Sequence, residues 1–321
     1  MPGMDRKSKV GLVGTGMVGA SFAYALMQRG LANELVLVDA NRGRAEGEEM
    51  DLNHGLPFVR PMQIMAGDYA DLAGAAVTVV TAGAAQRPGE TRLQLLERNA
   101  AIFRQIIPAV AQSNPHGIIL IATNPVDIMS QLAVEMSGLD RRHVFGSGTI
   151  LDSARFRYLL AEHYALDPRS VHAYIIGEHG DSELAVWSLA NIAGVRLRDF
   201  KSATGKGYDE GALQRIFEQT RDAAYAIIER KGATYYAIGL GLLTIVEAIV
   251  RDQHTVLTVS SVMTGQYGVS DICISLPTIV GADGIEEVLE PSLSREETEQ
   301  FRHSANVLKQ SLAQLRAGGK G

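Results

Sequence analysis

A glycine-rich turn near the start of the chain constrains the fold more than any other feature of the sequence. Gly14, Gly16 and Gly19 form the pattern G-x-G-x-x-G, which directly follows the apolar residues 9–13 and opens a stretch with helical character. The next apolar stretch ends at Asp39, twenty residues past the last glycine. A strand, a glycine turn, a helix and a second strand ending in an acid are together typical of a dinucleotide-binding unit.

Each part of this pattern has a physical role in binding a dinucleotide. The glycines permit a tight turn and a close approach of the backbone to a pyrophosphate, which the free N–H groups of the following helix can bind. The Asp39 carboxylate can accept hydrogen bonds from ribose hydroxyls and repels a 2′-phosphate, so NAD is favoured over NADP. The residues predicted to bind NAD in this region are Gly14, Gly16, Met17, Val18, Gly19 and Asp39.

Strands and helical segments continue to alternate through the first half of the sequence. Further apolar runs occur at residues 62–66, 76–83 and 117–125, with helical segments between them. Apolar strands separated by helices indicate a parallel sheet that is covered on both faces. Ligands of such sheets bind at the carboxyl ends of the strands.

Two of these strand ends are candidate cofactor contacts. Thr81, Ala82 and Gly83 follow one strand, and Asn124 follows the next strand along the chain. Asn124 either hydrogen-bonds a nicotinamide or a substrate oxygen, or it caps the helix that begins at Pro125. The sequence leaves both alternatives open.

The second half of the sequence has a different pattern. Residues 255–263 and 272–280 alternate in polarity around a glycine turn at residues 265–268, which is typical of antiparallel strands. We therefore predict an α/β protein with two domains. A Rossmann-type domain with a parallel sheet is expected at residues 1–149, and a mixed α+β substrate domain with an antiparallel sheet at residues 150–321.

A loop rich in glycine, proline and arginine joins Gly83 to a long helical segment. It carries Gln86, Arg87 and Arg92. Loops of this composition often move, so we predict a lid over the cofactor site. The alternative is a solvated basic turn.

The helical stretch at residues 149–164 brings an acid and a cation together. Asp152 and Arg155 are three residues apart and share a face, whereas Arg157 points about 200° away from Arg155 at about 100° per residue. Asp152 and Arg155 therefore either face a site or form an intrahelical ion pair on the surface. Arg157 is free for another purpose.

His179 is the candidate proton donor. It follows an apolar run that stops at a glycine, in the stretch Y-I-I-G-E-H-G-D-S-E at residues 174–183. A glycine at this place ends a buried strand, and the imidazole that follows lies at the end of that strand, where it could exchange protons with a substrate. The alternative is a polar turn with a solvated histidine. A second histidine, His172, is expected in the preceding strand.

Composition and charge argue against several classes of function. A net charge of −6 over 321 residues gives no basic surface for nucleic acid. The longest apolar stretch, residues 235–246, is shorter than the roughly 20 residues that span a bilayer, so we expect a buried helix and no membrane partner. A single cysteine, Cys273, and no signal-peptide core in the first nine residues favour the cytoplasm. Because H-E-x-x-H, C-x-x-C and paired histidines are absent, no metal is expected.

Six motifs occur in the order in which one known family has them. They are G-T-G-M-V-G, A-G-A-A-Q-R-P-G-E-T-R, A-T-N-P-V-D, L-D-S-A-R-F-R, G-E-H-G-D-S-E and K-G-A-T. Together they resemble the NAD-dependent L-lactate dehydrogenases of the lactate/malate dehydrogenase family, of the bacterial allosteric type. The resemblance covers nearly the whole chain and implies reversible hydride transfer between NADH and pyruvate, giving L-lactate and NAD⁺.

The resemblance implies a role for each residue of the site. His179 matches the proton donor to the substrate carbonyl, and Asp152 matches the carboxylate that holds its imidazolium. Arg155 matches the residue that binds the substrate carboxylate, and Arg92 matches the lid arginine that polarises the reacting carbonyl. Ile238 matches an apolar residue packed against the nicotinamide ring.

Substrate choice is expected to depend on Gln86. An arginine stands there in the malate dehydrogenases and pairs with a second carboxylate, whereas a neutral amide leaves the extra charge of oxaloacetate unpaired. Thr234 also resembles the lactate dehydrogenases, and Asn124 matches a residue that contacts cofactor and substrate. Malate dehydrogenase is the alternative.

Arg157 and His172 match positions at which many bacterial members bind fructose 1,6-bisphosphate. Two cations from each of two subunits would hold a bisphosphate that favours an active homotetramer. Two further alternatives are an NAD-dependent glycosidase, which needs a metal, and a catalytically silent NAD-binding protein. Every catalytic position is filled, which argues against the silent protein.

Overall fold

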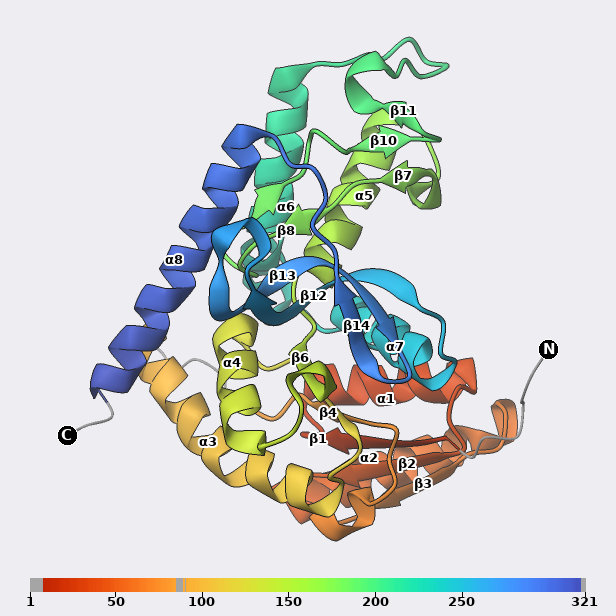
Figure 1. The fold of residues 1–321 in the computed structure, drawn as a ribbon. Helices are drawn as coiled ribbons and strands as arrows, with labels where there is room; N and C mark the ends of the chain where they lie inside the picture. The colour runs from red at the N-terminus through yellow and green to blue at the C-terminus, as the bar shows by residue number, and fades with distance from the viewer. Residues whose placement is uncertain (1–7, 85–88, 90, 319–321) are drawn as a thin grey trace.

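One nine-stranded sheet runs through the protein and joins its two halves (Figure 1). The computed structural model describes residues 8–84, 89 and 91–318. The strand order is β14-β13-β12-β6-β5-β4-β1-β2-β3, in which β1 to β6 are parallel. The parallel strands are β1 (Lys9–Val13), β2 (Glu34–Val38), β3 (Gln63–Ala66), β4 (Val77–Val80), β5 (Ile118–Ile121) and β6 (Val144–Gly146).

The parallel strands are apolar because helices cover both of their faces. Successive residues of a strand point to opposite faces, so Val10 and Leu12 enter one core and Val13 enters the other. Helices α1, α2 and α7 (Tyr236–Val250) cover the first core, and α3, α4 and α8 (Arg295–Gly318) cover the second. The helices of the first half are α1 (Met17–Arg29), α2 (Arg42–Gly55), α3 (Arg92–Ser113) and α4 (Val126–Ser137). The predicted Rossmann-type parallel sheet is confirmed.

The antiparallel strands of the second half extend the same sheet. β12 pairs with β6 at Ser260 and Gly146, and β13 and β14 follow outward. The predicted antiparallel strands are confirmed as β12 (Thr255–Thr264) and β13 (Ser270–Gly281), which β14 (Gly284–Val288) follows. The sheet therefore crosses the predicted domain boundary at residue 149 without a break.

A smaller part of the molecule stands above the sheet and has a core of its own (Figure 1). It contains α5 (Ile150–Tyr164), α6 (Glu210–Lys231), β7 (Val171–His172), β10 (Asn191–Ile192) and β11 (Val195–Arg196). The short strands β8 (Ile175–Ile176) and β9 (Leu184–Ala185) pair with each other below it. The expected single strand that carries His172 is thus two short strands, because β7 pairs with β10 whereas β8 pairs with β9.

Helix α7 (Tyr236–Val250) is only partly buried, which corrects the expectation for residues 235–246. Leu242 and Ile245 pack into the sheet core, whereas Tyr236 and Leu240 are 69% and 58% exposed. The helix therefore has one inner and one outer side. The last helix is α8 (Arg295–Gly318).

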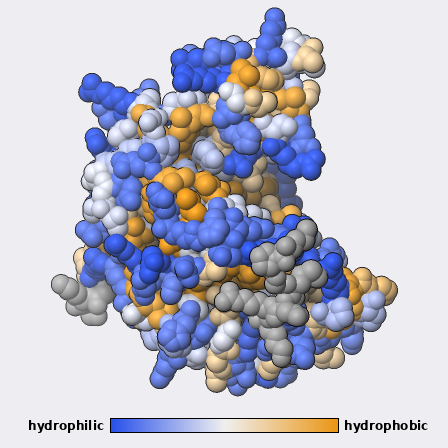
Figure 2. Space-filling model, turned by 45° about the vertical axis from the view of Figure 1, so that its right-hand side comes forward, coloured by the Kyte–Doolittle hydropathy of each residue, from blue (hydrophilic) through white to orange (hydrophobic). Residues whose placement is uncertain are grey.

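The surface mixes polar and apolar residues, as Figure 2 shows for one face, with apolar residues gathered across its middle. Within the part of the chain that the structure describes, no helix is both long and apolar enough to cross a membrane.

Candidate active site

The glycine turn after β1 is shaped by close contacts of the backbone. Gly14 has a φ of +99°, and a Cβ there would lie 2.5 Å from the backbone nitrogen of Ala82. A Cβ at Gly19 would lie 2.1 Å from the carbonyl oxygen of Gly14. These two glycines are therefore required by the packing of β1, α1 and the end of β4.

Gly16 differs from its neighbours because it faces open space. A Cβ at this position would meet no described atom within 4 Å. Gly16 caps α1 and has no side chain that could accept hydrogen bonds from the first N–H groups of that helix. Free N–H groups beside an open glycine suit a pyrophosphate, so the residues present fit a dinucleotide. Met17 and Val18 form the start of this helix.

Hydrogen bonds fix the other predicted cofactor contacts at the carboxyl edge of the sheet. Asp39 Oδ2 accepts from the Thr15 N–H at 2.7 Å, which holds the carboxylate beside the glycine turn. The Thr81 hydroxyl donates to the Gly14 carbonyl at 2.7 Å, and the Thr123 hydroxyl donates to the Ala82 carbonyl at 2.8 Å. The ends of β1, β2, β4 and β5 are thereby tied together.

The remaining contacts lie on three connecting segments. Gly83 lies close to Thr123, because a Cβ there would be 2.5 Å from that residue's Cγ2. Asn124 is exposed, and its carbonyl accepts from the Asn99 side chain at 3.0 Å. Pro125 is the cap residue of α4, which has no side-chain cap, so the capping alternative for Asn124 is wrong.

Other predicted residues are partly buried or lie outside the described residues. Ile238, in the first turn of α7, is half-buried against the sheet core, and Thr234 is half-buried in the loop before that helix. Arg92 is the first residue of α3, and its side chain is not described. Gln86 and Arg87 lie outside the described residues, so the lid stays a prediction.

Asp152 connects two cations at the mouth of β8. His179 Nδ1 lies 2.5 Å from Asp152 Oδ2, and Arg155 Nη1 donates to Asp152 Oδ1 at 3.0 Å. The Asp152 side chain is 3% exposed, whereas the His179 side chain is 23% exposed. With Nδ1 engaged, Nε2 is the ring atom that can face a substrate. The ion pair of Asp152 and Arg155 is therefore buried beside the histidine and is not a surface pair.

The electrostatics of this cluster favour a protonated imidazole. Burial lowers the pKa of His179, but Asp152, followed by Asp127 and Glu183, outweighs burial and raises that pKa to about 9. Burial also raises the pKa of Asp152, and there the charges of His179 and Arg155 prevail and lower it. The pair is therefore an imidazolium and a carboxylate at neutral pH.

Asp127 is a residue of the site to which the sequence pattern assigned no role. It is 1% exposed in the first turn of α4. Its Oδ2 accepts from the backbone N–H of His179 at 2.7 Å, and its Oδ1 accepts from the Ser260 hydroxyl at 2.6 Å. Burial raises the pKa of Asp127 to about 6. Asp127 thus fixes the backbone of His179 to α4, three residues after Asn124.

Arg157 leaves the face of α5 that Asp152 and Arg155 occupy. Its Nε donates to the Ala173 carbonyl at 2.8 Å, and its guanidinium carbon lies 5.2 Å from the centre of the Tyr174 ring. His172, the residue before Ala173, is exposed on β7. Arg157 is therefore hydrogen-bonded to the residue that follows His172 in the chain.

Two family models together match nearly the whole described chain. Residues 8–146 match the model described as "lactate/malate dehydrogenase, NAD binding domain", and residues 149–317 match "lactate/malate dehydrogenase, alpha/beta C-terminal domain". The chain belongs to the lactate/malate dehydrogenase family. The first part is accordingly an NAD-binding domain, and the protein is an NAD-dependent dehydrogenase.

Individual relatives are similar over almost their full length. An L-lactate dehydrogenase from Priestia megaterium is 53% identical over 303 residues, which cover 94% of this chain and 95% of that protein. One from Synechococcus sp. is 52% identical and covers 96% of this chain and 99% of its own.

Solved structures agree with this family. The crystal structure of a lactate dehydrogenase enzyme from a Medee basin deep-sea metagenome library matches with a TM-score of 0.93 at 44% identity, covering 97% of this chain and 99% of that one. The minor L-lactate dehydrogenase from Enterococcus mundtii matches with a TM-score of 0.92 at 42% identity, covering 96% and 98%.

We expect Asp127→Ala to lower kcat/KM for pyruvate by about tenfold or more, because unpaired buried donors cost about 1–3 kcal/mol. Asp127→Asn should recover most of this loss, since its amide oxygen can accept from His179 N–H while its nitrogen donates to Ser260. The dissociation constant of NADH, measured by fluorescence titration, should change less than twofold in both variants. Exposed Asp140 offers a control as Asp140→Ala. Equal losses for Asp127→Ala and Asp127→Asn would contradict the positioning role.

Proposed function

We propose that the protein is an L-lactate dehydrogenase that transfers hydride reversibly between NADH and pyruvate, with a second candidate, malate dehydrogenase, as the alternative. The observation that carries the proposal is the buried cluster of His179, Asp152 and Arg155 beside a dinucleotide cradle. Identity of about half to L-lactate dehydrogenases over nearly the whole chain supports the substrate class.

Each residue of the cluster has a distinct part in the proposed reaction. The nicotinamide, when bound, supplies the hydride to the carbonyl carbon. His179 donates the proton to the carbonyl oxygen from Nε2, while Asp152 holds the ring through Nδ1 and stabilises its charge. Arg155 is 12% exposed and offers its planar guanidinium to the substrate carboxylate. Arg92 polarises the carbonyl as negative charge develops on the oxygen.

Substrate choice is assigned to Gln86, with Asn124 and Thr234 as further contacts. A second carboxylate on the substrate would lack a cation opposite Gln86, so oxaloacetate would be desolvated without compensation. Pyruvate has a methyl group there and avoids this cost.

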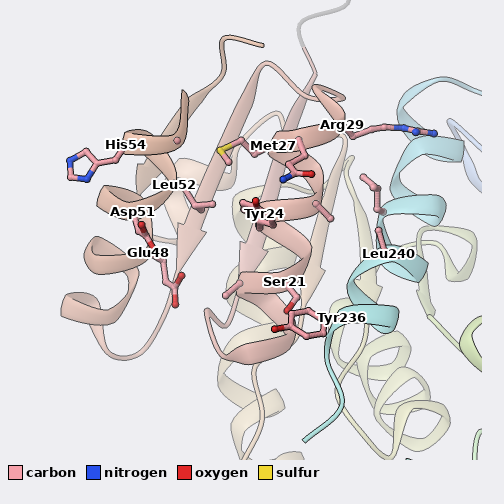
Figure 3. Close-up of a pocket in the computed structure, with 15 residues that line it drawn as sticks. Ser21, Tyr24, Met27, Arg29, Glu48, Asp51, Leu52, His54, Tyr236 and Leu240 are labelled. Carbon is pink, nitrogen blue, oxygen red and sulfur yellow. The ribbon is translucent and has the colours of Figure 1, made fainter. Parts of the chain in front are cut away.

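A homotetramer is proposed from the resemblance and is supported by an exposed apolar groove. Figure 3 shows this groove between α1, α2 and the outer side of α7. Tyr24, Tyr236 and Leu240 line it and are 54%, 69% and 58% exposed. Exposed apolar patches of this kind mark contacts between subunits in symmetric assemblies.

Two further expectations from the sequence remain predictions. They are the boundary between two domains at residue 149 and the location of the protein in the cytoplasm.

Fructose 1,6-bisphosphate is the proposed activator, with Arg157 and His172 as its ligands. Burial lowers the pKa of Arg157, which indicates a guanidinium with few water contacts. Such a cation gains from a phosphate partner. The exposed imidazole of His172 lies next to Ala173, to which Arg157 is hydrogen-bonded.

Substrate preference tests the proposal directly. We expect kcat/KM to be higher for pyruvate than for oxaloacetate in an assay of NADH oxidation. Gln86→Arg should change the ratio of the two values by at least about a hundredfold toward oxaloacetate, because it supplies the missing cation. Arg87→Gln serves as the control and should keep the preference for pyruvate. A natural preference for oxaloacetate would establish malate dehydrogenase instead.

The pH dependence tests the role of His179. Pyruvate reduction needs the protonated ring, so kcat/KM for pyruvate should fall as pH rises through about 9, while kcat/KM for lactate should rise. Asp152→Asn removes the largest raising contribution, so the fall should begin near the ordinary histidine pKa of about 6.5. If kcat/KM is independent of pH for both pyruvate reduction and lactate oxidation, His179 does not take part in the proton transfer.

Activation is tested by repeating the assay with fructose 1,6-bisphosphate. We expect the KM for pyruvate to fall about fivefold or more, a coupling of about 1 kcal/mol. His172→Ala and Arg157→Gln should each remove the response, whereas exposed Arg169→Gln, close to His172 in sequence, should retain it. If the bisphosphate does not change the KM of the wild type, or still lowers the KM of these two variants, Arg157 and His172 are not its binding site.

A further inference from the structure

Glu183 is a buried acid beside the catalytic pair. It lies just before β9 and is 7% exposed. One of its carboxyl oxygens, one carboxyl oxygen of Asp152 and one ring nitrogen of His179 all lie within 4.8 Å of one another. The Oε1 atom of Glu183 is buried and has no hydrogen-bond partner among the described residues.

This environment opposes a negative charge on Glu183. A carboxylate oxygen that is buried without a hydrogen bond, as Oε1 is, loses its hydration without compensation. Two carboxylates that share one site do not both ionise at neutral pH unless cations balance them, and the two cations nearest the site are bound to Asp152. Asp152 therefore keeps the charge, and the proton stays on Glu183.

The charges around Glu183 lead to the same conclusion. Burial, and then the charge of Asp152, raise the pKa of Glu183 well above its usual range, against the opposing effects of His179, Arg155 and Arg221. The charged groups that act on Glu183 are Asp152, His179, Arg155 and Arg221. The titratable and charged groups that line the cavity beside it are Asp181 of its own loop, Arg196 and Arg198 of β11 and the turn after it, Glu210 of α6, and Glu296, Glu297, Glu299 and His303 of α8.

Glu183 also lines a cavity of about 850 Å³. The cavity lies between α6, the start of α8 and the loop of Glu183, and Trp187, Phe217 and Glu297 are among its lining residues. Glu183 thus lines this cavity and also lies beside the His179–Asp152 pair. Its proton can exchange with water in the cavity without passing through the substrate site.

We propose that Glu183 is a neutral carboxylic acid in the substrate-free protein at neutral pH and acts on catalysis through His179. The inference rests on the proposed dehydrogenase function for its kinetic consequence. An ionised Glu183 would add a further anion to Asp152 and Asp127 near the ring and stabilise the imidazolium further. Lactate oxidation, which needs the neutral ring, would then be suppressed further at neutral pH. The neutral acid keeps the proton of His179 transferable in both directions.

Infrared spectroscopy of the substrate-free protein tests the protonation state. At pH 7 we expect a protonated carboxyl C=O band that is lost in Glu183→Gln and retained in Glu296→Gln, which removes an exposed acid at the same cavity. If the spectra of wild type and Glu183→Gln show no such difference at pH 7, Glu183 is ionised and the proposal fails. This measurement needs no turnover, so it stands even if the proposed substrate is wrong.

The kinetic consequence is tested with lactate. In the wild type, the loss of a proton from either Glu183 or His179 makes the loss of the other proton less favourable, so the rise of kcat/KM at alkaline pH should extend over more pH units than one titration. Glu183→Gln should reduce it to a single titration, and Glu296→Gln should keep the wild-type breadth. A wild-type rise that already follows a single titration, as narrow as that of Glu183→Gln, would overturn the proposal. If Glu183→Gln does not fold, Glu183→Met, which is apolar and similar in length, replaces it.

Discussion

The buried charge of Asp152 is the interaction on which the arrangement of the site depends. One carboxylate binds the imidazole through Oδ2 and the guanidinium through Oδ1, so it orients both cations at once. A buried carboxylate is stable only with such partners, and removing one partner of a buried pair costs about 3–5 kcal/mol. The same geometry that stabilises the charge therefore places a proton donor and a carboxylate-binding group side by side.

The scaffold supplies the remaining constraints from elements that are distant in sequence. Asp127 at the start of α4 fixes the backbone of His179, and Ser260 of β12 fixes Asp127. Gly177, just before the histidine loop, forms a bridge with Ser275 of β13. The parallel strands hold the cofactor residues at their carboxyl ends, and the antiparallel strands hold the histidine loop at the adjacent edge.

The sequence predicted those features that depend on local pattern. The glycine turn, the alternating strands, the helix of Asp152 and the opposite directions of Arg155 and Arg157 all follow from spacing along one element. Pairing of β12 with β6 joins residues far apart in the chain, and no local pattern specifies it. The burial of Asp127 and Glu183 could not be predicted from the sequence either. Both residues stand in recognised motifs, but a motif does not indicate the solvent exposure of a carboxylate. The outer side of α7 was missed because its apolar residues resemble core residues.

The continuous sheet decides how the molecule can bend. Because β12 is paired with β6, and α7 and α8 cover the same faces as α1 and α3, the sequence regions on either side of residue 149 form one mechanical body. The separately packed body begins with α5, which carries Asp152 and is joined to β12 through the Ser153 and Thr258 hydroxyls, whereas Asp127 and Ser275 anchor the loop of His179 to the sheet. Any flexing between these two bodies would act on the distance between the histidine and its carboxylate, so mechanical stiffness at this junction is a requirement of the chemistry.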